Sequence, residues 1–402
     1  MRWSTRSLGK PNAPTRIANR MTRFATLSNI SAKNAFASPA RNQGLRGTVV
    51  ALSKCAGSYH EGARMPGVPD RESSQLDLFA APPSPRRPSP LADRLEREHA
   101  EAAAVAARLP PGVRFGTSSW SFPDWAGLVY SRVATVAELA REGLREYARH
   151  PLLATVGIDR SYYAPIPPED LVRYAAQLPP GFLGCAKAPE TVTSAAMPAR
   201  ARSSTKGTNP DFLNPRLFVD EMVGPFGELF REHTGPFLLQ FPPVPVSLRT
   251  RPGEFAEKLD RFLAALPPDF RYAVELRDPS LLTVDYRRAL AAHGAAHVYN
   301  YVTAMPMPAD QARVVPVDSA AFAVIRLLLR PGTRYGERRD EMMPFNRVSD
   351  RNDEMRSEVA SLVRTAVDTG IPVSVLVNNK AEGCAPLTIR ALADILADSA
   401  VG

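Results

Sequence analysis

Two charged residues end an apolar segment in the middle of the sequence. In RYAVELRDPSLL, residues 271–282, Glu275 and Arg277 follow the stretch YAV. Residues two apart on a strand face the same side, so both side chains are expected to point into one space. Asp278 has the opposite parity and is expected to cap the following turn. Charges clustered in a cleft often mark a site, and Glu275 is the candidate general acid or base there.

Polar or aromatic side chains recur at the ends of other apolar segments. Any one of them could be a structural hydrogen-bonding residue, but their repetition favours a shared site. Besides Glu275 and Arg277, the residues concerned are Ser118, Trp120, Asp159, Tyr162, Tyr163, Lys187, Gln240, Arg326, Asn378 and Asn379.

Three basic residues in this set predict a small anionic or polar substrate, such as a phosphorylated one. Arg277 and Arg326 can each recognise a phosphate or carboxylate with two parallel hydrogen bonds. Lys187 could act catalytically through a Schiff base if it is desolvated, although a fixed positive charge is the commoner role. The alternative is an internal ion-pair network in which Glu275 pairs with Lys187 or Arg326.

Asn378 and Asn379 precede a loop and a helix predicted to begin at Pro386. Phosphate groups bind at such helix N-termini in many barrels. The alternative is that both asparagines satisfy backbone groups of the loop. The neighbouring loop 329–352 is rich in arginine and is expected to be a lid, an anion-steering surface or a plain solvated loop.

Aromatic residues that could stack a ligand, and residues that could bind a metal, are the remaining candidates. Trp120, Tyr162 and Tyr163 could stack a base or a sugar, although large aromatics more often pack in a core or at its rim. No cluster of histidines with Asp and Glu marks a metal site, so we expect neither a metal nor a cofactor. A Mg²⁺ ion held by Glu275 and Asp159 is the alternative.

The elements that position these residues are short apolar strands separated by helical segments. Eight strands with intervening helices predict a (β/α)8 barrel over residues 113–398, with its chemistry at the strands' C-terminal ends. A doubly wound open sheet is the alternative, but no G-x-G-x-x-G turn follows the first strand. The predicted strands are 113–117, 154–158, 182–187, 237–241, 272–276, 297–301, 322–328 and 373–377. The predicted helices are 135–149, 168–177, 216–231, 254–265, 284–293, 353–369 and 386–397.

The positive charge of the chain lies at its N-terminal end. Residues 1–70 contain eleven Lys and Arg and two acids, which accounts for the whole net charge of +9. The remaining residues are neutral overall, so direct nucleic-acid binding by the body is not supported. The segment 1–70 has no hydrophobic periodicity and is interpreted as a disordered tail. It is interpreted as an over-extended start, with Met21 or Met65 as the initiator, and a transit-like peptide is the alternative.

Residues 71–90 form a linker that contains the peptide QLDLF. Gln75, Leu76, Leu78 and Phe79 resemble the short peptide by which bacterial repair and replication proteins bind the DNA sliding clamp. An apolar peptide in a mobile segment suits such docking, although five residues can also arise by chance. A leading helix is predicted over 91–110.

Cysteine spacing and hydropathy predict a cytoplasmic protein. The three cysteines, Cys55, Cys185 and Cys384, are far apart and form neither a disulfide framework nor a zinc motif. No apolar segment is long enough to span a membrane, so we expect a soluble protein with no membrane partner.

Six sequence blocks resemble the YecE-like family, a domain of unknown function. They are GTSSW (116–120), YY (162–163), KAPETVT (187–193), FLLQFPP (237–243), VELRDPS (274–280) and VNNKAEGCAP (377–386). The resemblance covers about residues 113–398 and implies a TIM barrel similar in shape to endonuclease IV and sugar-isomerase barrels. It implies no reaction.

The chain also departs from the family's commoner pattern. The motif near E-x-N-x-F-Y after the second strand is replaced here by Gly157 and Asp159 before the tyrosines. The T-H pair becomes Thr193–Ser194, and the R-x-H-G after strand seven becomes Arg326–Leu327–Leu328. The chain therefore lacks the Glu, Asn and His groups that the commoner pattern has at these positions.

Three functions follow from these observations. The leading hypothesis is a metal-independent enzyme, a hydrolase or a lyase, that acts on a small anionic or polar substrate at the barrel mouth. The second is a DNA-maintenance accessory protein recruited through QLDLF. The third is a non-catalytic ligand-binding barrel, which would retain its ligand without turnover.

Overall fold

Eight parallel strands form a barrel in the computed structural model, which describes residues 90–197, 207–333 and 335–398. The strands are β1 (Val113–Thr117), β2 (Leu153–Ile158), β3 (Leu183–Ala186), β4 (Phe237–Phe241), β5 (Tyr272–Leu276), β6 (Ala296–Tyr301), β7 (Ala323–Leu327) and β8 (Val373–Val377). The predicted tail 1–70 and the QLDLF linker 71–90, apart from Pro90, lie outside the described residues.

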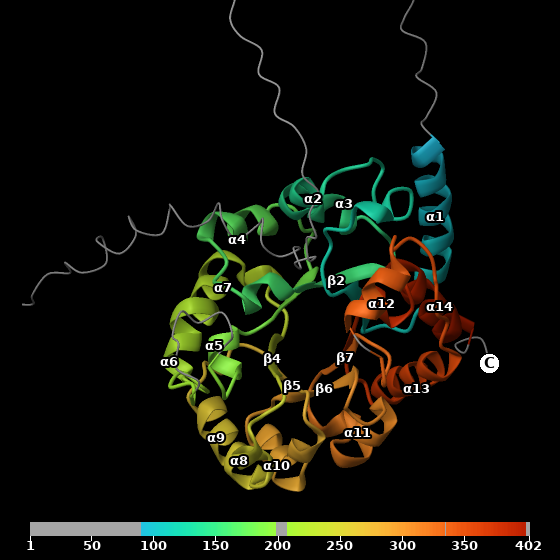
Figure 1. Ribbon diagram of the computed structural model, residues 1–402. Helices are drawn as coiled ribbons and strands as arrows, with labels where there is room; N and C mark the ends of the chain where they lie inside the picture. The colour runs from blue at the N-terminus through green and yellow to red at the C-terminus, as the bar shows by residue number, and fades with distance from the viewer. Residues whose placement is uncertain (1–89, 198–206, 334, 399–402) are drawn as a thin grey trace, which may run out of the picture. The chain divides into compact units, whose positions relative to one another are not determined.

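The strand order is β3-β2-β1-β8-β7-β6-β5-β4. Between the two outer strands, Lys187 is bridged to Leu238, and the Ala188 N–H donates to the Leu238 carbonyl at 2.9 Å. These contacts bring β3 beside β4, and the helices lie around the resulting ring (Figure 1). The predicted (β/α)8 barrel is confirmed, and every predicted strand lies within a residue or two of an observed one.

The leading helix α1 (Pro90–Ala106) precedes the barrel and packs against the last helix, α14, through Arg390, which pairs with Glu98 and Glu101. The remaining α-helices are α2 (Val136–Glu142), α3 (Leu144–Tyr147), α4 (Pro168–Ala175), α5 (Glu190–Thr193), α6 (Pro215–Phe218), α7 (Gly224–Leu229), α8 (Val246–Arg249), α9 (Pro252–Ala264), α10 (Val284–Ala292), α11 (Pro308–Val314), α12 (Tyr335–Met342), α13 (Asp353–Asp368) and α14 (Ala385–Asp398).

Single turns of other helix types connect several elements. They are η2 (Pro123–Trp125), η3 (Asp159–Tyr162), η4 (Val219–Val223), η5 (Arg231–His233), η6 (Pro279–Leu281), η7 (Val317–Ser319) and η8 (Asn379–Ala381); η4 is a π turn and the others are 3₁₀ turns.

All seven predicted helical segments correspond to observed helices, but two of them are divided. Segment 135–149 divides into α2 and α3 at Gly143, and segment 216–231 divides into α6, η4 and α7. Helices α5, α8, α11 and α12 were not predicted. The α12 sequence YGERRDEM has almost no apolar residues, so periodicity gives no signal there.

Two apolar layers hold the barrel together. The large core lies between the strands and the surrounding helices. A smaller cluster fills the interior of the barrel and consists of Cys185, Leu238, Ala273, Ala296, Val298, Phe322, Val324 and Leu376. Alternate strand residues belong to alternate layers, as the period of two requires.

Local contacts agree with the predicted turn after β5. The Oδ1 atom of Asp278 accepts hydrogen bonds from the Ser280 N–H (3.2 Å) and hydroxyl (2.7 Å), and its Oδ2 accepts from Arg249 Nε (3.0 Å). Asp278 therefore caps η6, as its parity indicated. In the described ranges, no helix has the length and apolar character needed to cross a membrane.

Candidate functional site

The interior positions at the C-terminal ends of the strands gather the charged residues singled out by sequence. Gln240 of β4 lies opposite Glu275 of β5, and Asn300 of β6 lies opposite Arg326 of β7. Each follows by two residues a side chain of the interior apolar cluster, namely Leu238, Ala273, Val298 and Val324. The same parity that fills the barrel with apolar groups thus directs these polar groups into its mouth.

Arg326 is fully buried and joins two carboxylates. Its Nη1 donates to Glu275 Oε2 (2.5 Å), and its Nη2 donates to both oxygens of Asp159 (3.1 Å each). Because these residues come from the ends of β7, β5 and β2, one guanidinium connects three strands. Its Nε has no hydrogen-bond partner among the described residues.

Arg277 donates a hydrogen bond to the other carboxylate oxygen of Glu275. Its Nε donates to Glu275 Oε1 (2.5 Å), and its Nη2 donates to Gln240 Oε1 (3.0 Å). The Arg277 side chain is 21% exposed, whereas that of Glu275 is fully buried. No described residue accepts a hydrogen bond from Arg277 Nη1. Arg277 therefore brings an unused donor to the solvent side of the cluster.

Lys187 extends the network on the β3 side. Its Nζ lies 3.2 Å from Asp159 Oδ2 and 5.1 Å from the centroid of the Tyr162 ring. Its side chain is 9% exposed. The ammonium group is thus held by one carboxylate and one aromatic face, a favourable environment for a cation.

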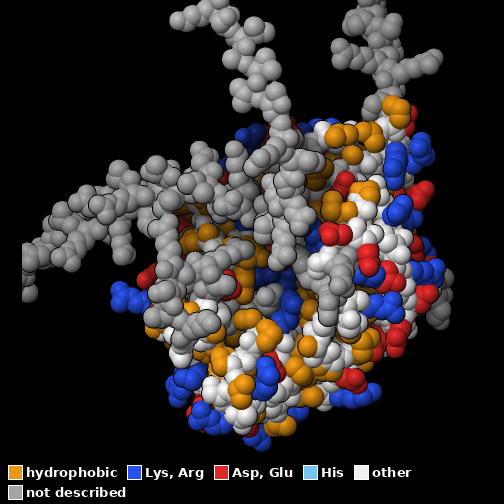
Figure 2. Space-filling model, viewed as in Figure 1, with side chains coloured by type: hydrophobic (Ala, Val, Ile, Leu, Met, Phe, Trp, Pro, Cys, Tyr) orange, Lys and Arg blue, Asp and Glu red, His pale blue; other side chains and the backbone are white. Residues whose placement is uncertain are grey.

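The cluster has more positive than negative groups. Among the described residues, Lys187, Arg277 and Arg326 form ion pairs only with Asp159 and Glu275, so the five side chains of this network carry a net charge of +1. Figure 2 shows Lys and Arg side chains inside a hollow in the middle of this face. An excess cation among mostly buried groups is an electrostatic environment suited to an anion.

Burial and the neighbouring charges set the protonation of the central groups. Burial alone raises the pKa of Glu275, but Arg277, Arg326 and Lys187 outweigh it and lower that pKa to about 2. Burial lowers the pKa of Lys187, and Asp159 opposes that effect. Glu275 is therefore an ionised carboxylate at neutral pH with both oxygens engaged, whereas Lys187 is nearer to losing its proton than a free lysine.

Gly157 of β2 lies too close to the chain that follows β1 to carry a side chain. A Cβ atom on Gly157 would lie 2.8 Å from the Ser118 carbonyl oxygen. Two residues later, Asp159 directly follows β2 and contributes its carboxylate to the cluster.

The predicted aromatic residues divide into core and surface. Trp120 is 4% exposed, its Nε1 donates to the Leu139 carbonyl at 2.9 Å, and its ring packs edge-on against Tyr174 at 5.0 Å. These contacts are those of a core residue and leave no open face for stacking. Tyr162 is buried beneath Lys187, whereas Tyr163 is 58% exposed and packs edge-on against Tyr162.

The two asparagines have the structural role considered as the alternative. Asn378 Oδ1 accepts from the Lys380 N–H (3.0 Å), and Asn379 Oδ1 accepts from the Ala385 N–H (2.8 Å) at the start of α14. Asn379 Nδ2 is buried without a hydrogen-bond partner among the described residues, as is the Ser118 hydroxyl. The geometry brings neither asparagine into hydrogen-bond contact with the charged cluster.

One buried ion pair was not singled out in the sequence. Arg356 of α13 makes a two-pronged contact with Glu382, which also accepts from the Asn352 N–H at 2.7 Å. The backbone N–H groups of Ser349 and Asp350 donate to the Glu382 carbonyl. These bonds fix the end of loop 329–352 beside the β8 loop. The only sequence signal is the acid inside the quoted block VNNKAEGCAP.

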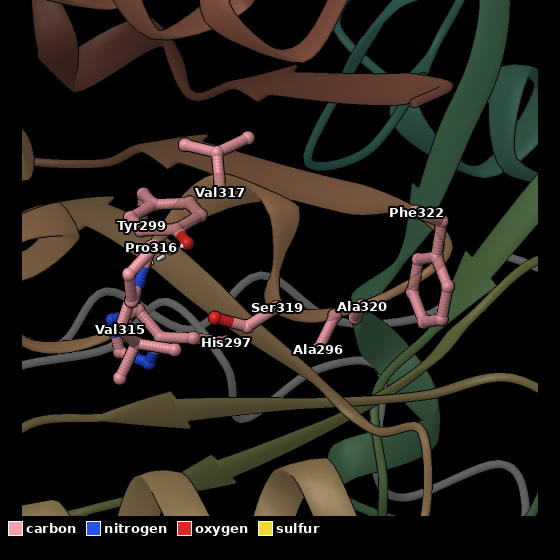
Figure 3. Close-up of a pocket in the computed structure, with 9 residues that line it drawn as sticks. All are labelled: Ala296, His297, Tyr299, Val315, Pro316, Val317, Ser319, Ala320 and Phe322. Carbon is pink, nitrogen blue, oxygen red and sulfur yellow. Dashed lines mark hydrogen bonds between the residues drawn. The ribbon is translucent and has the colours of Figure 1, made fainter. Parts of the chain in front are cut away.

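Neither a metal-ligand cluster nor the pocket beside β6 adds residues to the charged cluster within the described part of the chain. Among the residues that the structure describes, no group of three or more His, Cys, Asp and Glu side chains is arranged to hold a metal ion. Figure 3 shows a small pocket beside β6, which has no room for a water molecule. It is lined by Ala296, His297, Tyr299, Val315, Pro316, Val317, Ser319, Ala320 and Phe322, none of which belongs to the charged cluster.

Comparison with known proteins agrees with the sequence blocks. The family described as "Protein of unknown function DUF72" matches residues 114–401. A crystal structure of a DUF72 family protein from Enterococcus faecalis has a TM-score of 0.50 and 16% identity, and the match covers 71% of this chain and 95% of that one. A DUF72 family protein from Thermotoga maritima has a TM-score of 0.49 and 19% identity, with 71% and 98% covered. No curated protein matches the chain.

Proposed function

The chain belongs to the DUF72 family, whose function is unknown, and we propose that it is an enzyme that binds a small anionic substrate at the C-terminal mouth of its barrel. The observation that carries this proposal is the charge imbalance at the mouth. Three cations meet two carboxylates there, and the most exposed of the three cations, Arg277, has a donor without a described partner. A carboxylate or phosphate group of the substrate supplies the missing negative charge.

Arg277 and Lys187 are the groups assigned to contact the anion. The Arg277 guanidinium is held in one orientation by Glu275 and Gln240, so little conformational entropy is lost when it binds. Lys187 is held by Asp159 on the other side. Arg326 and Glu275 are positioning residues, because both are fully buried and their contacts fix the two groups that face solvent.

Lys187 is also the group assigned to proton transfer. Efficient acid–base catalysis needs a pKa near the working pH, and burial moves the pKa of Lys187 downward in that direction. The pKa of Glu275 lies far below neutral, at about 2, so Glu275 is poorly suited to the general acid or base role expected from sequence. Its carboxylate instead keeps Arg277 and Arg326 in place.

Substitution at Arg277 tests the binding step. Wild-type protein and Arg277→Gln would be screened by thermal shift against phosphorylated and carboxylate metabolites. The matched control is Arg390→Gln, whose side chain is 22% exposed and is also paired with acids, far from the mouth in α14. We expect at least one anion to raise the Tm of wild type and Arg390→Gln clearly more than that of Arg277→Gln. Equal shifts in all three proteins for every anion tested would contradict the proposal.

Substitution of Lys187 distinguishes an enzyme from a non-catalytic binding protein. Lys187→Arg keeps the positive charge but replaces the amine by a guanidinium that stays protonated. For an anion found in the screen, we expect this variant to bind with similar affinity and to lose turnover. Retained turnover would remove Lys187 from proton transfer. Tight binding by the wild type with no turnover of any ligand would favour the non-catalytic alternative.

A further inference from the structure

A second charged depression lies at the opposite, N-terminal end of the barrel. It has a volume of about 380 Å³ and is lined by Arg114, Gly181, Leu183, Arg231, Thr234, Gly235, Asp269, Phe270 and Arg271. These residues come from the starts of β1, β3, β4 and β5 and from the loops before them. The depression is within the size range of sites for small molecules.

The arginines of this depression form no ion pair within the described part of the chain. Arg114, Arg231 and Arg271 form no side-chain hydrogen bond or salt bridge with any other described residue. Arg231 lies over the Phe270 ring (5.3 Å to the centroid), and Arg271 lies over the Phe322 ring (5.5 Å). These contacts orient two guanidinium groups but use none of their N–H donors.

Arg114 is the most informative of the three because its position is interior. It lies opposite Ser374, two residues before Gly116, which lies opposite Leu376 of the interior apolar cluster. Its side chain therefore belongs to the inner face of the barrel, where it is only partly exposed. An unpaired guanidinium in such a place costs stability unless an anion completes its hydrogen bonds.

We propose that this depression is a second binding site, for the phosphate or carboxylate group of a small molecule. Three arginines against Asp269 give the depression a net charge of +2. Backbone hydrogen bonds run through its lining: the Gly235 N–H donates to the Gly184 carbonyl, and the Phe237 N–H donates to the Arg271 carbonyl. The apolar cluster inside the barrel lies between this site and the charged cluster at the mouth.

The test uses pyrophosphate and citrate as probes, one for each source of negative charge. Binding is measured by calorimetry on the full chain carrying Arg277→Gln. This substitution weakens anion binding at the mouth, so the measured heat reports binding at the second site. Adding Arg114→Gln is expected to weaken binding about tenfold or more, because charge-assisted hydrogen bonds are lost. The matched control adds Arg288→Gln, which removes one positive charge from exposed α10 and is expected to change nothing.

Thermal melts without a probe distinguish a binding role from a structural one. Because Arg114 has no described hydrogen-bond partner, Arg114→Gln is expected to leave the Tm unchanged or to raise it. Pyrophosphate or citrate is then expected to raise the Tm of the background protein but not that of the variant. If Arg114→Gln does not fold, the exposed Arg231→Gln replaces it in both assays. Equal probe affinity with and without the substitution overturns the proposal.

Discussion

Replacing Glu275 by glutamine gives a direct measure of the ion pairs at the mouth. Glutamine has almost the same shape but no charge, so Arg277 and Arg326 lose their shared carboxylate. The lowering of the Glu275 pKa from 4.5 to about 2 corresponds to about 3 kcal/mol. Removal of one partner of a buried ion pair typically lowers the free energy of unfolding by about 3–5 kcal/mol. Both routes predict that Glu275→Gln lowers the free energy of unfolding by about 3 kcal/mol at pH 7.

The pH dependence of this loss follows from the same pKa. Glu275 has a lower pKa in the folded protein than in the unfolded chain, so its ionised form stabilises the fold above pH 4.5. That stabilisation is lost as the pH falls from 4.5 toward 2. The difference between wild type and Glu275→Gln should therefore be constant near neutral pH and shrink in acid.

Urea denaturation of the two proteins at pH 7 and at lower pH measures this difference. The control is Asp394→Asn, which removes a 45% exposed partner of Arg390 and is expected to change the free energy of unfolding by less than about 1 kcal/mol. A loss below about 1 kcal/mol for Glu275→Gln, or a loss that stays constant into acid, would refute the reasoning.

Three further predictions concern other parts of the chain. Burial lowers the pKa of His150 from 6.5 to about 3, so the stability that neutral His150 contributes above pH 6.5 is lost as the pH falls. The free energies of unfolding of wild type and His150→Gln, measured by urea denaturation, should therefore converge in acid. Asn379→Ala should lower stability by about 1 kcal/mol, measured by denaturation, because it removes the acceptor at the start of α14; no change would contradict that role. Leu78→Ala/Phe79→Ala should abolish recovery on immobilised sliding clamp; recovery equal to wild type would exclude QLDLF docking.

The residues at the strand ends could be predicted because side chains alternate between the interior and the exterior of the barrel along each strand. This alternation depends only on position within the strand. Glu275 and Arg277 alternate with apolar residues, and a period of two assigns them to the interior without any knowledge of their partners. Lys187, Gln240 and Arg326 follow the same rule. The barrel itself could be predicted for a similar reason, since eight short apolar segments separated by helices have few alternative arrangements.

The pairing of those residues could not be predicted, because it depends on distances across the barrel. Both oxygens of Glu275 accept hydrogen bonds from arginines, a pairing that the sequence does not specify. Trp120 follows β1 closely in the sequence, yet its ring turns into the core, where Leu139 accepts its hydrogen bond. The Arg356–Glu382 pair joins α13 to the loop after β8, a contact that no periodicity encodes.

The charged network at the mouth has a physical cost that stability alone does not explain. Apolar residues of similar volume often replace a buried ion pair without loss of stability, so five ionised groups on neighbouring strands are a poor way to close a barrel. Their arrangement makes sense if the groups must be fixed before a ligand arrives. Glu275 and Asp159 hold three cations at separations that mutual repulsion would otherwise oppose, and they leave one positive charge unbalanced. An anion that binds there meets donors already oriented and mostly desolvated, which is the condition under which electrostatic recognition is strong. Replacing Arg326 by methionine should therefore both lower the free energy of unfolding, because Glu275 and Asp159 lose a buried partner, and weaken anion binding measured by calorimetry, because Arg326 holds Asp159 and Glu275 in place for the two cations that face solvent.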